Sequence, residues 1–105
     1  MTKVEFFSDG KGLYGFKIEG HSSDNCDDTD GKIVCSAVSS AAYMAANTVS
    51  EIIGDKCEIA VDDAFIEITV NDVSESSRAV LEGLKLHITE LSKQYKKRIR
   101  IITEV

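Results

Sequence analysis

Residues 20–39 read GHSSDNCDDTDGKIVCSAVS, and this stretch decides the fold. An alternating apolar segment ends at Gly20-His21, and residues 22–32 that follow contain no Val, Ile, Leu or aromatic side chain, which is typical of a loop. From Ile33 to Ile53 an apolar stripe at helical spacing predicts a long helix, with Gly54 as the residue that ends it. The predicted order is therefore a strand, a loop and a helix, with an imidazole and a thiol near the two ends of the loop.

Upstream of this stretch, the sequence predicts a β-hairpin. Residues 2–8 are typical of a strand, residues 9–12 (Asp-Gly-Lys-Gly) favour a turn, and Tyr14, Phe16 and Ile18 then alternate with polar or small residues.

Downstream, a second hairpin is predicted. Cys57, Ile59 and Val61 alternate and are expected in the core, residues 62–63 favour a turn, and residues 64–70 alternate again. A capping box with Asp72 as N-cap and Glu75 three residues later then predicts a second helix. Arg98 to Val105 is expected to form the last strand.

The element order ββαββαβ predicts an α+β fold: two helices packed on a mixed or antiparallel five-stranded sheet, in a single domain over residues 1–105. The net charge of −6 is unevenly distributed: residues 1–75 carry five Lys and Arg against fifteen Asp and Glu, and residues 76–105 carry seven against three. An acidic body argues against direct nucleic-acid binding and favours a basic partner. The basic run from Lys93 to Arg100 is interpreted as a solvated helix end.

No apolar run approaches the length of a membrane span, and the first ten residues are too polar for a secretory signal, so a cytoplasmic protein is expected. Three cysteines in unpatterned spacing do not form a disulfide framework. A zinc site from His21, Cys26 and Cys35 lacks the compact ligand pairs of a zinc finger, and residues 26–37 do not fit a calcium loop. We therefore predict no metal and no cofactor.

Cys35 is the candidate nucleophile. On the first turn of a long helix, a thiolate is stabilised by backbone N–H groups and the helix dipole, and the same N–H groups can bind an oxyanion. His21 is the candidate base, because the loop between the two residues can close easily. Each also has an ordinary interpretation: Cys35 as a small buried apolar residue, and His21 as a surface residue at a strand end.

Gly20-His21, a polar loop, and Ile33-Val34-Cys35-Ser36-Ala37-Val38-Ser39 together resemble the ribosomal-processing cysteine protease family, Prp, over essentially the whole chain. The resemblance implies a homodimeric endopeptidase that removes the N-terminal extension of the twenty-seventh large-subunit ribosomal protein, a basic precursor. It implies that Cys35 is the nucleophile and His21 the base, that Gly20 shapes the approach to the histidine, and that Ser39 helps to hold the loop.

Two positions depart from the family pattern. Lys32 stands where the family has an aspartate, for which Asp30 is a possible replacement, and the loop between His21 and Cys35 is about two residues longer. These departures keep two other hypotheses open: a non-catalytic ribosome-associated binding module, and a metal or redox sensor that uses Cys26 and Cys35.

Overall fold

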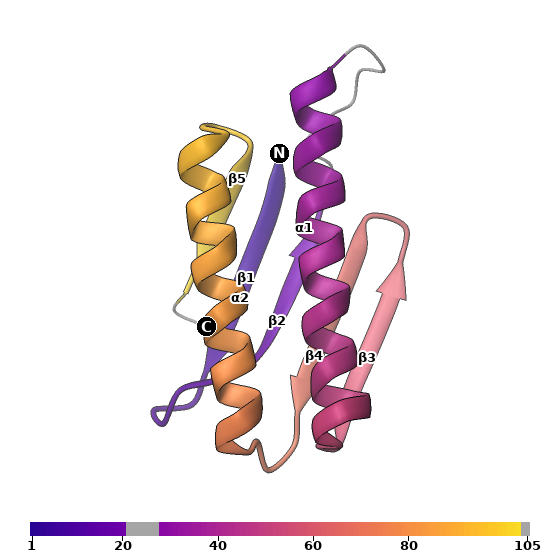
Figure 1. Ribbon diagram of the computed structural model, residues 1–105, viewed down its shortest axis with the longest axis vertical. Coiled ribbons are helices and arrows are strands. Elements are labelled where there is room, and N and C mark those ends of the chain that lie inside the picture. The colour runs from indigo at the N-terminus through magenta and orange to yellow at the C-terminus, as the bar shows by residue number, and fades with distance from the viewer. Residues whose placement is uncertain (21–27, 104–105) are drawn as a thin grey trace.

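The computed structural model describes residues 1–20 and 28–103 (Figure 1). The elements in chain order are β1 (Thr2–Ser8), β2 (Leu13–Glu19), α1 (Thr29–Asn47), a π-helical segment η1 (Thr48–Ile53), β3 (Cys57–Asp62), β4 (Phe65–Val70), α2 (Glu75–Gln94) and β5 (Ile99–Ile102). This order confirms the predicted ββαββαβ arrangement.

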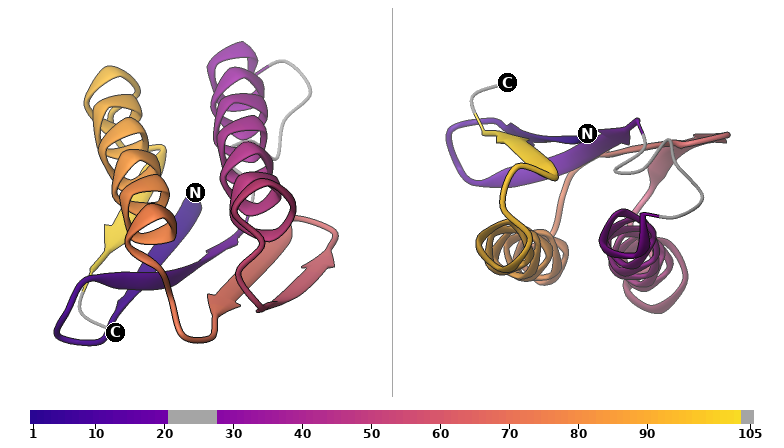
Figure 2. Two further views of the ribbon diagram at one scale, coloured as in Figure 1. Left: turned by 60° about the horizontal axis from the view of Figure 1, so that its bottom comes forward. Right: turned by 90° about the horizontal axis from the view of Figure 1, so that it is seen from above.

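The five strands form one mixed sheet in the order β3-β4-β2-β1-β5. β1 pairs with β5 in parallel, and the pairs β1–β2, β2–β4 and β3–β4 are antiparallel. Both helices lie on the same face of the sheet, side by side (Figure 2). The fold is therefore the predicted two-layer α+β architecture.

The core lies between the helices and the central strands. Alternate residues of β1, β2 and β4 point toward the helices, as a period of two requires, and α1 and α2 each contribute one apolar stripe. The largest fully buried side chains are Phe6, Phe16, Ile68, Leu81, Ile88, Val4, Val34, Val38 and Val49, together with Ser77. The rings of Phe6 and Phe16 lie 6.4 Å apart between centroids and join β1 to β2.

Gly15 permits the close pairing of β2 with β4. It lies opposite Thr69, and a Cβ atom at position 15 would meet the carbonyl oxygen of Ile68 at 2.2 Å. Because this oxygen belongs to the backbone, no rotation of a side chain could relieve the overlap. Any residue with a Cβ would force the two strands apart.

β3 differs from the prediction, because its alternating apolar residues do not enter the core. Ile59 is 44% exposed and Val61 is 52% exposed, while Cys57 is half-buried. β3 is the edge strand, and it lies beyond α1, so no helix covers this margin of the sheet (Figures 1 and 2). Alternation identified the strand correctly but could not show how far the helical layer extends.

The predicted helix starts also need correction. α1 begins at Thr29, four residues before the predicted Ile33, because the Asp28 side chain accepts a hydrogen bond from the Gly31 N–H at 3.1 Å. α2 is capped by Ser74, whose hydroxyl accepts from the Ser77 N–H at 3.2 Å. Asp72 is not the N-cap: it has a φ of 49° and lies in the turn before the helix.

The other boundaries agree more closely with the sequence. Gly54, with a φ of 83°, ends the first helical segment in the left-handed conformation as predicted. The last strand, predicted from Arg98 to Val105, covers Ile99–Ile102. Residues 104 and 105 lie outside the described part of the chain.

By length and composition alone, the helix Thr29–Ile53 could cross a membrane, with a mean hydropathy of 1.2 over its most apolar window. This differs from the expectation that no segment approaches a membrane span. Alanine raises the hydropathy of this helix, and Ala42, Ala45 and Ala46 are buried against the sheet and α2. Core packing therefore accounts for these alanines, within a window of which 33% is buried.

Candidate active site

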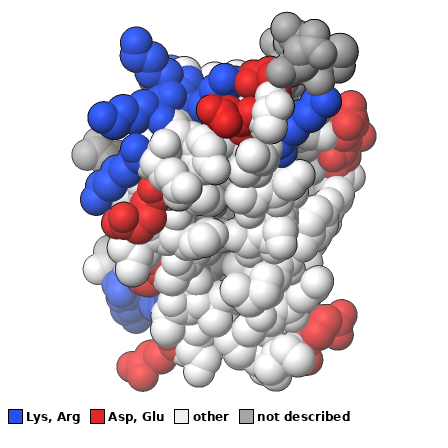
Figure 3. Space-filling model, turned by 45° about the horizontal axis from the view of Figure 1, so that its top comes forward, with Lys and Arg blue, Asp and Glu red and all other residues white. Residues whose placement is uncertain are grey.

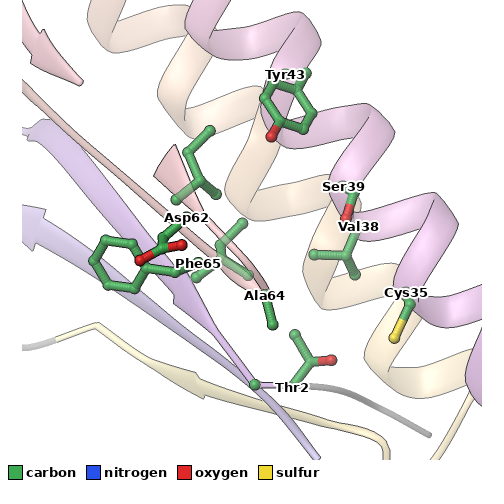
Figure 4. A pocket seen from close by; sticks show the side chains of 11 residues that line it. Thr2, Cys35, Val38, Ser39, Tyr43, Asp62, Ala64 and Phe65 are labelled. Atoms are coloured by element: carbon green, nitrogen blue, oxygen red, sulfur yellow. The ribbon is translucent and has the colours of Figure 1, made fainter. Parts of the chain in front are cut away.

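Cys35 lies on α1 and is half-buried. Its side chain lines a hollow of about 190 Å³ between α1 and one end of the sheet. Figure 4 shows Cys35, Val38 and Ser39 on α1, with Thr2 and Ala64 on the opposite side. The hollow gives a candidate nucleophile a place beside which a peptide can lie.

Gly20 lies at the end of β2 and lines the same hollow as Cys35. Its N–H donates to the carbonyl oxygen of Ala64 at 3.0 Å, and its φ of 92° is one that glycine adopts readily. A Cβ here would meet the Met1 carbonyl oxygen at 2.7 Å. Glycine is thus required where the chain leaves the sheet beside the hollow.

The structure does not test the Cys–His dyad. His21 lies outside the described residues, so its pairing with Cys35 stays a prediction. The structure does bring Gly20, the residue before it, to the hollow that Cys35 lines.

The two supporting residues lie in different places. Ser39 follows Cys35 by one helical turn and lines the same hollow. Asp30 is exposed in the first turn of α1 and is not among the residues that line the hollow. Lys32, which occupies the family's aspartate position, is also exposed.

The prediction that Cys35 lies on the first turn of its helix is wrong. Because α1 begins at Thr29, Cys35 is its seventh residue, where backbone N–H groups are used by the helix itself. At the true helix start, the Asp28 carboxylate takes up the N–H of Gly31. The described conformation therefore does not offer the N–H groups of the helix start to an oxyanion beside Cys35.

Asp28 is a structural residue at this site that sequence reasoning missed. Besides capping α1, its carboxylate forms a bidentate ion pair with Arg98. The hydrogen bonds that Arg98 donates to the Asp28 carboxylate raise the pKa of Arg98 above its usual range. The two residues are 70 positions apart, so no local pattern could have revealed the contact.

Tyr43, Asp62 and Phe65 also line the hollow and were missed. Tyr43 comes from α1, Asp62 is the last residue of β3, and Phe65 is the first residue of β4. The signal available in the sequence was the turn predicted at residues 62–63; the structure has this turn one residue later, at residues 63–64, because β3 continues to Asp62. Its proximity to Cys35 depends on the strand order. Together these side chains offer apolar and aromatic surface with one carboxylate.

Cys57 is poorly suited to act as a nucleophile. Burial raises the pKa of its thiol, and the negative charges of Asp55 and Glu51 add to the effect. A raised pKa keeps the thiol protonated, and the protonated form is the weaker nucleophile.

Within residues 1–20 and 28–103, no group of three or more His, Cys, Asp or Glu side chains is placed to hold a metal ion. His21 and Cys26, which the zinc and redox alternatives require, lie outside those ranges. Those alternatives therefore stay untested.

A model of the cysteine protease Prp family matches residues 1–100. The fold is similar to that of an essential ribosomal processing protease Prp from S. aureus in complex with a covalently linked product peptide, with a TM-score of 0.85, 19% identity, and 98% of this chain and 99% of that chain covered. It is also similar to SMU.848 from Streptococcus mutans, with a TM-score of 0.81, 20% identity, and 98% and 95% covered. No curated protein matches the sequence significantly.

Proposed function

Because the chain belongs to the cysteine protease Prp family, we propose that it is an endopeptidase that removes the N-terminal extension of the twenty-seventh large-subunit ribosomal protein. The observation that carries the proposal is the hollow that Cys35 lines together with Gly20 and Ser39. Its wall contains the half-buried thiol, and the glycine before His21 lies at the same place.

In the proposed reaction, His21 accepts the proton of the Cys35 thiol, and the sulfur attacks the scissile carbonyl carbon. The tetrahedral intermediate collapses to a thioester as the C–N bond breaks, and His21 donates its proton to the leaving amine. Water then attacks the thioester with His21 as base. The S–C bond breaks, releasing the extension as a carboxylate and restoring the thiol. No cofactor or metal takes part.

Charge supports a basic substrate. The carboxylate of Asp62 lies in the wall of the hollow, and the sequence has a net charge of −6. In Figure 3, the basic side chains gather at one end of the molecule, and the face over the helices is largely uncharged. A basic precursor is attracted to an acidic wall.

We propose that Gly20 and Ser39 support the hollow and that Asp30 takes the role of the missing family aspartate.

We further propose that the protein is cytoplasmic and forms a homodimer, as the family resemblance implies. Light scattering coupled to size-exclusion chromatography measures the mass directly. A monomer at micromolar concentration would contradict the homodimer and would leave the protease proposal intact.

The experiment that tests the protease proposal uses the purified precursor ribosomal protein and mass spectrometry of its products. The wild type is expected to shorten the precursor at one site. Cys35→Ala and His21→Ala are each expected to reduce the rate by at least about a thousandfold, as removal of a nucleophile or its base does. Cys57→Ala is the matched control and should cleave normally.

Uncut precursor with the wild type, or equal cutting by Cys35→Ala, would reject the protease. Binding of the precursor without cleavage would favour the ribosome-associated binding module. The Asp28 cap at the start of α1 favours this alternative, because the cap uses backbone N–H groups that an oxyanion would need.

A further inference from the structure

The uncovered edge strand β3 leads away from the Cys35 hollow. Two hollows share Asp62 and Phe65 in their walls: the one that contains Cys35, and a second lined by Ala60, Val61, Asp62, Asp63 and Phe65. The two hollows therefore adjoin at the β3–β4 turn, next to the end of the uncovered edge strand. We propose that the edge of β3 binds the substrate's N-terminal extension as an added β-strand; this inference rests on the proposed function.

The backbone groups of β3 that face outward follow from the register. The Asn71 N–H donates to the Lys56 carbonyl oxygen at 2.8 Å, and Asp62 lies opposite Phe65 at the other end of the pairing. In an antiparallel ladder, hydrogen-bonded pairs alternate, so Lys56, Glu58, Ala60 and Asp62 direct their N–H and C=O groups toward β4. The corresponding groups of Cys57, Ile59 and Val61 therefore point to the open edge.

The same residues carry the apolar side chains of this edge. Ile59 and Val61 lie opposite Ile68 and Ile66 and so share the helix-facing side of the sheet, yet both are about half exposed. An added strand would form hydrogen bonds with their backbones and place every second side chain beside theirs. The site fits an extended peptide with apolar residues at alternate positions.

The charges on this edge favour a peptide over a second copy of the chain. Two copies pairing antiparallel through β3, with Ile59 opposite Val61, would place Glu58 of each copy opposite Asp62 of the other. Like charges directly opposite destabilise a strand pair. A basic substrate, which the family resemblance implies, would instead place positive charge near Asp62 and Asp63.

The test compares two synthetic peptides that contain the precursor cleavage site. The short peptide has three residues before the scissile bond, and the long peptide has ten, enough to follow the six residues of β3. For the wild type, we expect kcat/KM to be about tenfold higher for the long peptide, since only the long peptide can form the backbone hydrogen bonds with β3.

Ile59→Pro removes one N–H that points to the open edge, so every hydrogen bond between β3 and β4 remains. Proline is tolerated at such edge positions. Ile59→Thr is the matched control, since it keeps the N–H and the β-branch. Ile59→Pro should lose most of the advantage of the long peptide and cleave the short one normally. Ile59→Thr should keep most of the advantage in kcat/KM of the long peptide over the short one. An unchanged ratio in Ile59→Pro, or no advantage in the wild type, would overturn the inference.

A binding measurement separates this inference from the proposed function. Cys35→Ala is mixed with the long peptide, and amide hydrogen exchange is followed. Slower exchange at Ile59 and Val61 supports strand addition even if the wild type cleaves nothing, whereas unchanged exchange with a bound peptide overturns it. If the amides of Ile59 and Val61 are protected from exchange without peptide, and more so at higher protein concentration, β3 pairs with a second copy of the chain and the inference is overturned.

Discussion

The start of α2 is attached to a neighbouring loop by hydrogen bonds to Asp55 that include the fully buried Ser77, whereas the start of α1 is attached by a partly exposed ion pair. At α2, the Asp55 carboxylate accepts from the Ser74 N–H at 3.0 Å, the Ser74 hydroxyl at 2.7 Å and the Ser77 hydroxyl at 2.6 Å. At α1, Asp28 caps the helix and pairs with Arg98.

The two anchors differ in solvent exposure. Ser77 is fully buried, whereas the side chains of Arg98 and Asp28 are 32% and 22% exposed. Partly exposed ion pairs contribute little to stability, but a buried donor that loses its acceptor is costly. The helix that carries Cys35 therefore has the weaker attachment at its N-terminus. Opening its first turn would free the N–H groups that the described conformation uses in the cap.

The largest effect is expected from Asp55→Ala, which breaks the stronger anchor. The substitution leaves the buried Ser77 hydroxyl and the Ser74 N–H without their acceptor, so the melting temperature should fall by about 5–15 °C. Differential scanning calorimetry measures the change, with exposed Glu51→Ala as the control. A fall no greater than that of the control would show that the network does not anchor α2.

Ser74→Ala tests the cap of α2 with Asp55 still present. Loss of an N-cap hydroxyl should lower the free energy of unfolding by about 1 kcal/mol. Urea denaturation followed by circular dichroism measures this, and Ser74→Thr, which keeps the capping hydroxyl, is the comparison. If Ser74→Ala is as stable as the wild type, the cap is not what starts this helix.

Asp28→Ala breaks the weaker anchor and should act locally. We expect faster amide exchange in residues 29–32 and a change in global stability below about 1 kcal/mol, because the rest of α1 stays packed on the sheet. Exchange measured residue by residue by NMR gives both quantities. Global destabilisation larger than that of Ser74→Ala would reverse the ranking of the two anchors.

The smallest effect is expected in acid. The Ser77 hydroxyl and the Ser74 N–H hold the pKa of Asp55 below its usual value of 3.8, and Arg78 lowers the pKa of Asp9 to about 2. A depressed pKa in the folded state adds stability above the unfolded pKa, and this stability is lost as the pH falls through the folded value.

Melting temperature should therefore be nearly constant above pH 5 and decline below about pH 4. Asp55→Asn should weaken the decline between pH 4 and pH 2 by a few degrees, and Asp9→Asn should do so independently. An identical profile in the wild type and both variants would contradict the assigned pKa shifts.

Much of the fold could be predicted from local patterns, because strand alternation and helical stripes follow from which faces are buried. The cap of α1 could not, since Asp28 gains its second partner from Arg98, far along the chain. Asp72 and Ser74 are both good capping residues, and the network around Asp55 favours the second. Ile59 and Val61 were wrongly expected in the core because alternation carries no information about the width of the helical layer.

For the site, the sequence indicated Cys35 because this residue follows the polar loop at residues 22–32, near the predicted start of the helix, and because it matches the family motif. It did not indicate Asp62 and Phe65, which reach the hollow only because β4 pairs with β2 rather than β1; Tyr43 was also missed, although it follows Ser39 by one turn on the same helix. Strand order depends on contacts between distant segments, and no local periodicity encodes it. The predicted role of His21 depends on its place at the end of the second strand, before a loop that can close easily, and on the family motif.

The parallel pairing of β1 with β5 has a consequence for biosynthesis. Thr2 lies beside Ile99 and Glu5 beside Ile102, so the first strand made gains its second neighbour only after the last strand has left the ribosomal exit tunnel. Contacts between such distant segments also form slowly. During translation, one edge of β1 stays unpaired until β5 has emerged. A chaperone that shields this edge would reduce aggregation of the nascent chain.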